Sequence, residues 1–270
     1  MQGKFIDVKG IKTHYHDLGA GDPVVLLHSG EFGADSETTW ELTMEPLARH
    51  FRVLAPDWLG YGLTEKLFDF EDMFMKRVQH IADFLQVMGI SNAHFVGNSM
   101  GGSTLLTVAA MDGGHWPIRK IVLASGGGLA PDNDARKVLN TYDMTKEHMR
   151  RVLEVLILRP ELRDDPDYLE RRYQKSLIPG AWECTAAVRF KPPGQSTGFS
   201  PRRAGSTANV RVPTLLIAGA RDPLRNPGYA QALVDELPNG ELALFEDAGH
   251  CPQLDCPEAF NERVIAFLKR

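Results

Sequence analysis

Residues 97–102, with the sequence Gly-Asn-Ser-Met-Gly-Gly, place the strongest constraint on what this chain can fold into. An apolar run at 95–96 stops at Gly97, and a helix-compatible run follows Gly102. The pattern predicts a strand, a tight turn and a helix, with Ser99 at the apex of the turn. Glycine is required beside the serine because a Cβ would collide with the neighbouring strand or helix. The stretch indicates a nucleophile elbow, although an ordinary glycine-rich strand-to-helix turn has the same short signature.

Apolar runs and helical patterns alternate along most of the chain. Runs typical of buried strands occur, besides the strand before Ser99, at 24–27, 52–57, 119–124, 214–218 and 241–245. Helical patterns lie between them, at 39–50, 73–88, 229–237 and 257–269. Two alternating segments, 4–8 and 12–16, predict a hairpin at the edge of the sheet. Together they predict an α/β fold with a mostly parallel eight-stranded sheet and helices on both faces.

Residues 130–206 interrupt this alternation and contain no buried strand run. Helices are predicted at 145–158, 168–177 and 181–190, and a loop rich in Pro, Gly, Ser and Arg at 191–205. We therefore expect a core formed by residues 1–129 and 207–270, with a helical lid inserted at 130–206. Ligands of open parallel sheets bind at the carboxyl ends of the strands, where the loops of this core converge.

Charge and cysteine usage exclude several classes of function. The net charge is −5 and no long basic run occurs, so we expect no nucleic-acid partner. No apolar run is long enough to span a membrane, and the N-terminus has no signal-like apolar segment. The three cysteines, Cys184, Cys251 and Cys256, have no metal-ligand spacing and predict reduced thiols in a cytoplasmic protein without a metal site.

Two later strand ends offer partners for Ser99. A serine hydroxyl needs a base to remove its proton and a third group to orient that base. Asp222 follows the strand at 214–218, and His250 follows the strand at 241–245. The order Ser99, Asp222, His250 is the one expected for a nucleophile elbow in this kind of fold.

Each partner also has a simpler interpretation. Asp222 precedes Pro223 and could be an ordinary turn residue, and His250 could be a polar residue ahead of a helix. Asp247 is a rival acid, but it lies too close to His250 in sequence to come from a different strand end. The joint placement of all three residues at successive strand ends favours the catalytic interpretation.

The same strand ends predict a site for an oxyanion. One donor is the backbone amide of Met100, which follows the nucleophile. The second donor should come from the loop after the strand at 24–27, where we favour the amide of Gly30 and then that of Ser29. His28 in this loop is expected to be a structural histidine below the site rather than a proton-transfer group.

The elbow and two further segments resemble the meta-cleavage-product hydrolases of the α/β-hydrolase superfamily. The segment 124–129, Ala-Ser-Gly-Gly-Gly-Leu, is similar to that family's Gly-Gly-Leu stretch, and 169–173, Leu-Glu-Arg-Arg-Tyr, resembles its arginine-bearing lid helix. The resemblance implies a cofactor-free hydrolase that cleaves a C–C bond in a carboxylated dienone, a ring-fission product of aromatic degradation. It implies that Arg172 binds the substrate carboxylate and that Asn98 lines the site. The other interpretation of Arg172 is a surface charge on an amphipathic helix.

The chain also departs from that family's pattern. The family's His-Gly-Gly-Gly-Pro-Gly loop is replaced by His-Ser-Gly-Glu-Phe-Gly at 28–33, and a family asparagine after it falls at Thr39. Cys251 stands where the family has tryptophan. A carboxylesterase or lactonase therefore stays open, as does a ligand-binding receptor of the same fold. The expected partner is a small-molecule substrate, and a homo-oligomer is left open.

Overall fold

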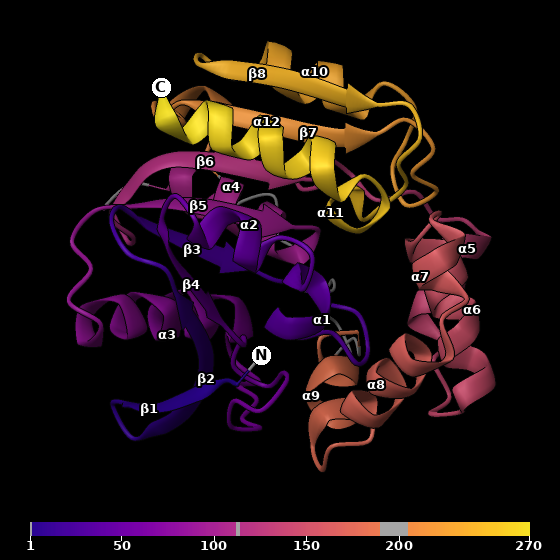
Figure 1. Cartoon of the computed structure of the whole chain (residues 1–270). Helices are drawn as coiled ribbons and strands as arrows, with labels where there is room; N and C mark the ends of the chain where they lie inside the picture. The colour runs from indigo at the N-terminus through magenta and orange to yellow at the C-terminus, as the bar shows by residue number, and fades with distance from the viewer. Residues whose placement is uncertain (1, 112–113, 190–204) are drawn as a thin grey trace.

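The computed structural model describes residues 2–111, 114–189 and 205–270, and it contains the expected eight-stranded sheet (Figure 1). The strand order is β1-β2-β4-β3-β5-β6-β7-β8. The strands are β1 (Lys4–Val8), β2 (Ile11–Leu18), β3 (Pro23–Leu27), β4 (Arg52–Pro56), β5 (Ala93–Asn98), β6 (Ile118–Ala124), β7 (Thr214–Gly219) and β8 (Gly240–Phe245). Six strands run parallel, whereas β1 pairs with β2 and β2 with β4 in antiparallel fashion. The prediction of a mostly parallel sheet with an edge hairpin is confirmed.

Helices cover both faces of the sheet because its central strands are apolar on both sides. Val25 and Leu27 of β3 pack with α3 (Met73–Val87), α4 (Met100–Ala110) and α10 (Tyr229–Asp235) on one face. Val24 and Leu26 face the opposite way and pack with α1 (Ser36–Trp40), α2 (Met44–Ala48) and α12 (Pro257–Lys269). Burial of each such side chain contributes about 1.5–3 kcal/mol. The rigid sheet between these layers fixes the positions of the loops at its carboxyl ends.

The prediction of one continuous helix at 39–50 is wrong. The structure has two short helices, α1 and α2, separated by a turn at 41–43. Pro46 explains the break, because proline has no N–H to bond the residue four places earlier in a continuous helix. In α2, Pro46 lies in the first turn, where that N–H is not needed.

A group of five helices lies between β6 and β7, within the segment predicted as a lid. These are α5 (Asp134–Asn140), α6 (Lys146–Leu156), α7 (Pro160–Arg163), α8 (Pro166–Ser176) and α9 (Ala181–Ala187). Figure 1 shows them gathered on the side toward which the arrows of β7 and β8 point. The helices expected at 145–158, 168–177 and 181–190 are present, the last ending at Ala187, while α5 and α7 are additional. The loop expected at 191–205 lies, except for its last residue, outside the described residues.

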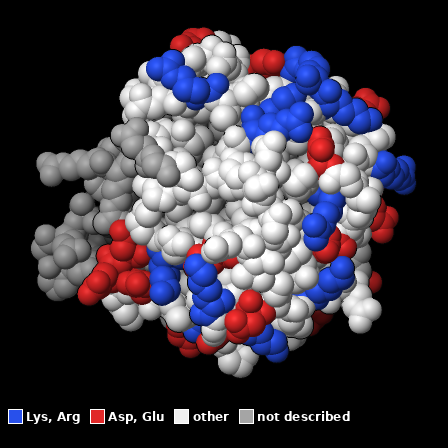
Figure 2. Space-filling model, turned by 90° about the vertical axis from the view of Figure 1, so that its left-hand side faces the viewer, with Lys and Arg blue, Asp and Glu red and all other residues white. Residues whose placement is uncertain are grey.

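Surface charge and helix length bear on the classes of partner considered above. In Figure 2, basic and acidic groups are interspersed around a largely uncharged centre of the face shown. Within the described ranges, no helix is both long and apolar enough to cross a membrane.

Candidate active site

The turn after β5 has the geometry of a nucleophile elbow. Ser99 has φ 52° and ψ −110°, a strained conformation for a residue with a side chain. Strain of this kind persists only where the surroundings enforce it. A Cβ on Gly101 would lie 2.1 Å from the carbonyl oxygen of Leu27, and one on Gly97 would lie 2.5 Å from the carbonyl carbon of Gly101. Glycine is therefore the residue that lets α4 approach β3 and β5 closely enough to hold Ser99 at the apex.

Ser99, His250 and Asp222 form one hydrogen-bonded chain. His250 Nε2 lies 2.7 Å from Ser99 Oγ, and His250 Nδ1 lies 2.8 Å from Asp222 Oδ2. Asp222 and His250 are buried, whereas Ser99 remains partly accessible. Asp222 also accepts a hydrogen bond from the amide of Leu224, at 2.8 Å. An ionised Asp222 accepts the proton on Nδ1, which leaves Nε2 free to accept the proton of Ser99.

The electrostatics of Asp222 favour this protonation state. Burial acts to raise the pKa of the carboxyl group. The charge and hydrogen bond of His250, together with the Leu224 amide, outweigh burial, and the pKa is lowered. The carboxylate therefore stays ionised at neutral pH and fixes the orientation of the imidazole.

The candidate oxyanion hole lies between α4 and the loop after β3. A Cβ on Gly30 would approach Met100 Sδ to 2.6 Å, so the backbone of Gly30 lies directly against Met100. Tyr61 Oη donates to the Gly30 carbonyl at 3.0 Å, which fixes the orientation of the peptide that follows Gly30. The Ser29 hydroxyl instead donates to Glu31 Oε1 at 2.9 Å. The contact of Gly30 with Met100 is consistent with the Gly30 amide as the second donor, and the choice between Gly30 and Ser29 stays a prediction.

Residues 24–263 of the chain match the alpha/beta hydrolase family. The chain belongs to this family. The match includes Ser99, Asp222 and His250, and it runs from the second residue of β3 into α12.

Relatives along the whole chain are more specific than the family. This hydrolase is 32% identical to a 2-hydroxymuconate semialdehyde hydrolase from Pseudomonas sp. (strain CF600), over 98% of this chain and 93% of that protein. It is 30% identical to a 2-hydroxy-6-oxo-6-(2'-aminophenyl)hexa-2,4-dienoic acid hydrolase from Metapseudomonas resinovorans, over 99% and 91%. The solved meta-cleavage product hydrolase from Pseudomonas fluorescens IP01 superposes with a TM-score of 0.87 at 27% identity, over 99% and 97%. The predicted fold and the resemblance to the meta-cleavage-product hydrolases are confirmed.

His28 of this hydrolase has a structural position, as expected from the sequence. Its Nε2 accepts the amide proton of Trp58 at 3.0 Å, and its Nδ1 lies 2.7 Å from the Ser29 carbonyl. A ring nitrogen that faces a carbonyl must carry the proton, so His28 is neutral with the proton on Nδ1. Complete burial lowers its pKa, which agrees with this state. His28 therefore braces the oxyanion loop against the loop after β4.

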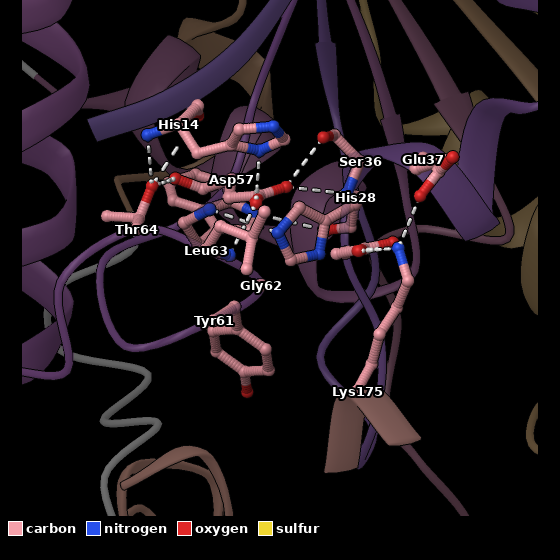
Figure 3. Close-up of polar contacts among 12 residues, drawn as sticks. His14, His28, Ser36, Glu37, Asp57, Tyr61, Gly62, Leu63, Thr64 and Lys175 are labelled. Atoms are coloured by element: carbon pink, nitrogen blue, oxygen red, sulfur yellow. Dashed lines mark hydrogen bonds and ion pairs between the residues drawn. The ribbon is translucent and has the colours of Figure 1, made fainter. Parts of the chain in front are cut away.

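A buried aspartate that the sequence analysis missed fixes that second loop. Asp57 accepts hydrogen bonds from the amide and hydroxyl of Ser36, the amide of Leu63 and His14 Nδ1, at 2.5–2.9 Å (Figure 3). Burial acts to raise its pKa, but these donors outweigh burial and hold the pKa far below the usual aspartate range. The network joins β2 and α1 to the loop after β4. Tyr61 of that loop in turn contacts the oxyanion loop at Gly30.

Asn98, which the resemblance places at the substrate site, has structural contacts beside the elbow. Its side chain is buried, and its amide group donates to the carbonyls of Ala124 at 3.1 Å and His250 at 3.2 Å. Both protons of the amide are thus used by the backbone and are not free for substrate. Asn98 therefore joins the elbow strand to β6 and to the loop that carries His250, and its contact with substrate stays a prediction.

Arg172 is not a surface charge: its guanidinium is buried and paired within the protein, although its Nε has no hydrogen-bond partner among the described residues. It is 2% exposed, and its Nη2 lies 2.7 Å from Glu31 Oε1 in the oxyanion loop. Burial acts to lower the pKa of Arg172, but the adjacent Glu31 carboxylate raises it above its usual value. Burial acts to raise the pKa of Glu31, but the charge and hydrogen bond of Arg172 outweigh burial and the pKa is lowered. Both groups are charged, and the charge of Arg172 is already neutralised by the protein.

Further contacts fasten α8 to the core around this pair. Arg171 bonds Glu41 at 2.8 Å, and Tyr168 Oη donates to the Thr38 carbonyl at 3.1 Å. Lys175 Nζ forms ion pairs with Asp35 and with Glu37 (Figure 3). One face of α8 is thus held along its length against α1 and the turn after it. These contacts fix the position of the α8 backbone that carries Arg172.

Proposed function

We propose that this hydrolase uses Ser99, His250 and Asp222 to cleave a C–C bond in a carboxylated dienone formed by ring fission of an aromatic compound. The observation that carries the proposal is the continuous hydrogen-bonded chain from Ser99 through His250 to Asp222. The two curated relatives act, by their names, on a 2-hydroxymuconate semialdehyde and on an aminophenyl hexadienoic acid. Both names describe conjugated products of this chemical class.

The first half of the proposed reaction forms a tetrahedral intermediate. Ser99 Oγ attacks the ketone carbon while its proton passes to His250 Nε2. Asp222 stabilises the imidazolium that results, and the amides of Met100 and Gly30 donate to the oxyanion. A water molecule activated by His250 is the alternative nucleophile.

The second half breaks the C–C bond. The electron pair of that bond moves to the carbon conjugated with the second carbonyl of the substrate, and the imidazolium of His250 protonates this carbon. Water deprotonated by His250 then attacks the acyl group on Ser99 and releases a carboxylic acid. One water molecule is added across the bond, no oxidation occurs, and the residues present suffice without a cofactor.

A carboxylesterase or lactonase is the second candidate. The observation that favours it is the Glu31–Arg172 ion pair, because the arginine that the resemblance assigns to the substrate carboxylate is already neutralised. The same serine, histidine and aspartate serve ester hydrolysis, in which an alcohol leaves in place of carbon. A non-turning receptor of this fold has less support, because the hydrogen-bonded chain that activates Ser99 is complete.

The deciding experiment compares the two substrate classes on purified protein. Hydrolysis of 2-hydroxy-6-oxo-6-phenylhexa-2,4-dienoate is followed by loss of its conjugated absorbance, and hydrolysis of p-nitrophenyl acetate by release of nitrophenolate. We expect multiple turnovers on the dienone and a loss of about 10⁴-fold or more in kcat for Ser99→Ala with the fold unchanged. Turnover of the ester alone would assign the protein to the second candidate. A single turnover on both would assign it to the receptor class.

The finer expectations on location and assembly also belong to this proposal. The three cysteines Cys184, Cys251 and Cys256 are free thiols, as is usual in a reducing compartment, and this supports a cytoplasmic enzyme. Residues 130–206 are proposed as the lid of the active site. A homo-oligomer is tested by light scattering of the purified chain.

A further inference from the structure

A cavity of about 750 Å³ lies between the oxyanion loop and the helices α5 and α9. Its size is that of a site for a small organic ligand. Three aromatic side chains line it, Phe32 beside the oxyanion loop together with Tyr142 and Trp182. Two arginines, Arg136 and Arg189, line the same cavity. A flat apolar ligand with an anionic group suits this combination of aromatic and guanidinium surfaces.

Arg189 links the cavity to the candidate oxyanion hole. Its Nη2 donates to the carbonyl of Gly30 at 3.3 Å, and its Nη1 donates to the carbonyl of Thr185. Its guanidinium lies 4.8 Å from the centre of the Phe32 ring. These contacts hold the guanidinium beside the loop that we propose to bind the oxyanion.

Arg136 on α5 has an unsatisfied donor. Its Nε is buried and has no hydrogen-bond partner among the described residues. Burial and the charges of Arg225 and Arg189 lower the pKa of Arg136, and the Asp222 carboxylate opposes this. These charges place Arg136 within electrostatic reach of the triad. A buried donor without a partner is costly, and an anionic ligand would remove that cost.

The two arginines are not neutralised by the part of the chain that the structure describes. The ion pairs of the neighbouring lid helix α8 are made by Glu170, Arg171, Arg172 and Lys175, and none includes Arg136 or Arg189. Asp132, the acidic residue in the cavity lining, is exposed at its edge. The cavity therefore presents two cations, whereas the charge of Arg172 is cancelled by Glu31.

We propose that Arg136 and Arg189 form a carboxylate-binding subsite of this enzyme. The carboxylate end of the substrate lies in the aromatic cavity, and its carbonyl lies against Gly30 and Met100. The identity of the full substrate rests on the proposed function. The subsite is tested by binding alone. The subsite and the proposed function can therefore be rejected independently of each other.

The test titrates benzoate into the Ser99→Ala protein by calorimetry, with benzamide as the uncharged analogue. We expect benzoate to bind and benzamide to bind at least tenfold more weakly. Arg136→Gln should weaken benzoate binding roughly tenfold, as expected for the loss of one charge-assisted hydrogen bond. Arg189→Gln should do the same, Arg189→Lys should restore part of the affinity, and benzamide binding should stay unchanged. Arg171→Gln on the outer side of α8 is the matched control and should leave both affinities unchanged.

Three outcomes would overturn the subsite. The first is no measurable benzoate binding to the Ser99→Ala protein, and the second is equal binding of benzoate and benzamide. The third is a loss of benzoate binding in the double variant Glu31→Gln/Arg172→Gln with none in Arg136→Gln or Arg189→Gln, which assigns the anion to Arg172. Because no turnover is measured, an enzyme that hydrolyses esters rather than dienones can still pass this test.

Discussion

Arg172 Nη2 of α8 lies 2.7 Å from Glu31 Oε1 of the oxyanion loop, and both side chains are buried. In the sequence these residues were separate observations, one a match to the meta-cleavage-product hydrolases and the other a departure from them. In the structure the two residues belong to one contact, because the buried arginine and the glutamate form an ion pair. The ion pair joins two residues that are 141 positions apart in the chain.

Removing one partner of this pair should destabilise the protein strongly. Glu31→Gln leaves the charge of Arg172 buried without compensation, which costs about 3–5 kcal/mol in the free energy of unfolding. Urea denaturation measures this value. The double variant Glu31→Met/Arg172→Met, which removes both charges, should recover most of the loss. Arg171→Gln, which breaks the more exposed pair with Glu41, should cost under about 1 kcal/mol.

Gly101→Ala should prevent correct formation of the elbow. The new Cβ would lie 2.1 Å from the carbonyl oxygen of Leu27, so α4 has to move away from β3. We expect a loss of about 4 kcal/mol or more in stability, together with loss of activity. Gly10→Ala is the control, because its Cβ meets nothing within 4 Å and only its positive φ opposes the change. Equal thermal midpoints for the two variants would contradict the close approach.

Asn98→Ala should impair catalysis through His250 rather than through substrate binding. The change leaves the carbonyls of Ala124 and His250 without their side-chain donor, at a cost of about 1–3 kcal/mol. We expect kcat to fall about tenfold or more while KM changes little. Steady-state kinetics on the preferred substrate separate these two terms. A large rise in KM with kcat unchanged would instead return Asn98 to the substrate site. Asn239→Ala, which removes an exposed amide bonded to the carbonyl of Arg211, is the control and should leave both constants unchanged.

Mild acid should destabilise the fold through its buried histidines. Burial lowers the pKa of His80 and of His94 to about 4, whereas the unfolded chain titrates near 6.5. Between these values the unfolded state binds more protons, so stability is constant above about pH 6.5 and falls as the pH decreases toward 4. Thermal midpoints measured between pH 8 and 4.5 should show this decline. His80→Gln, which keeps a polar group near Thr13, should reduce its slope, and an unchanged slope would show that His80 is not involved.

The sequence by itself determined the sheet, the elbow and the order of the triad. Each depends on local pattern: apolar runs define the strands, glycines define the turn at Ser99, and parallel strands deliver their following loops to one edge. Ser99, Asp222 and His250 could therefore be placed together without knowledge of any contact between them. The break between α1 and α2 also has a local cause, because Pro46 cannot take part in a continuous helix at 39–50.

Only the tertiary structure decided what the polar side chains around that triad bind. The partner of Arg172 comes from the oxyanion loop, that of Asn98 from the His250 loop, and those of Asp57 from β2, α1 and its own loop. Such contacts join residues distant in the chain and leave no periodic signal, because a buried charge or amide takes whichever partner the packed elements bring within hydrogen-bonding distance. Local pattern thus assembled the reactive groups, while packing determined the partners of the polar side chains around them.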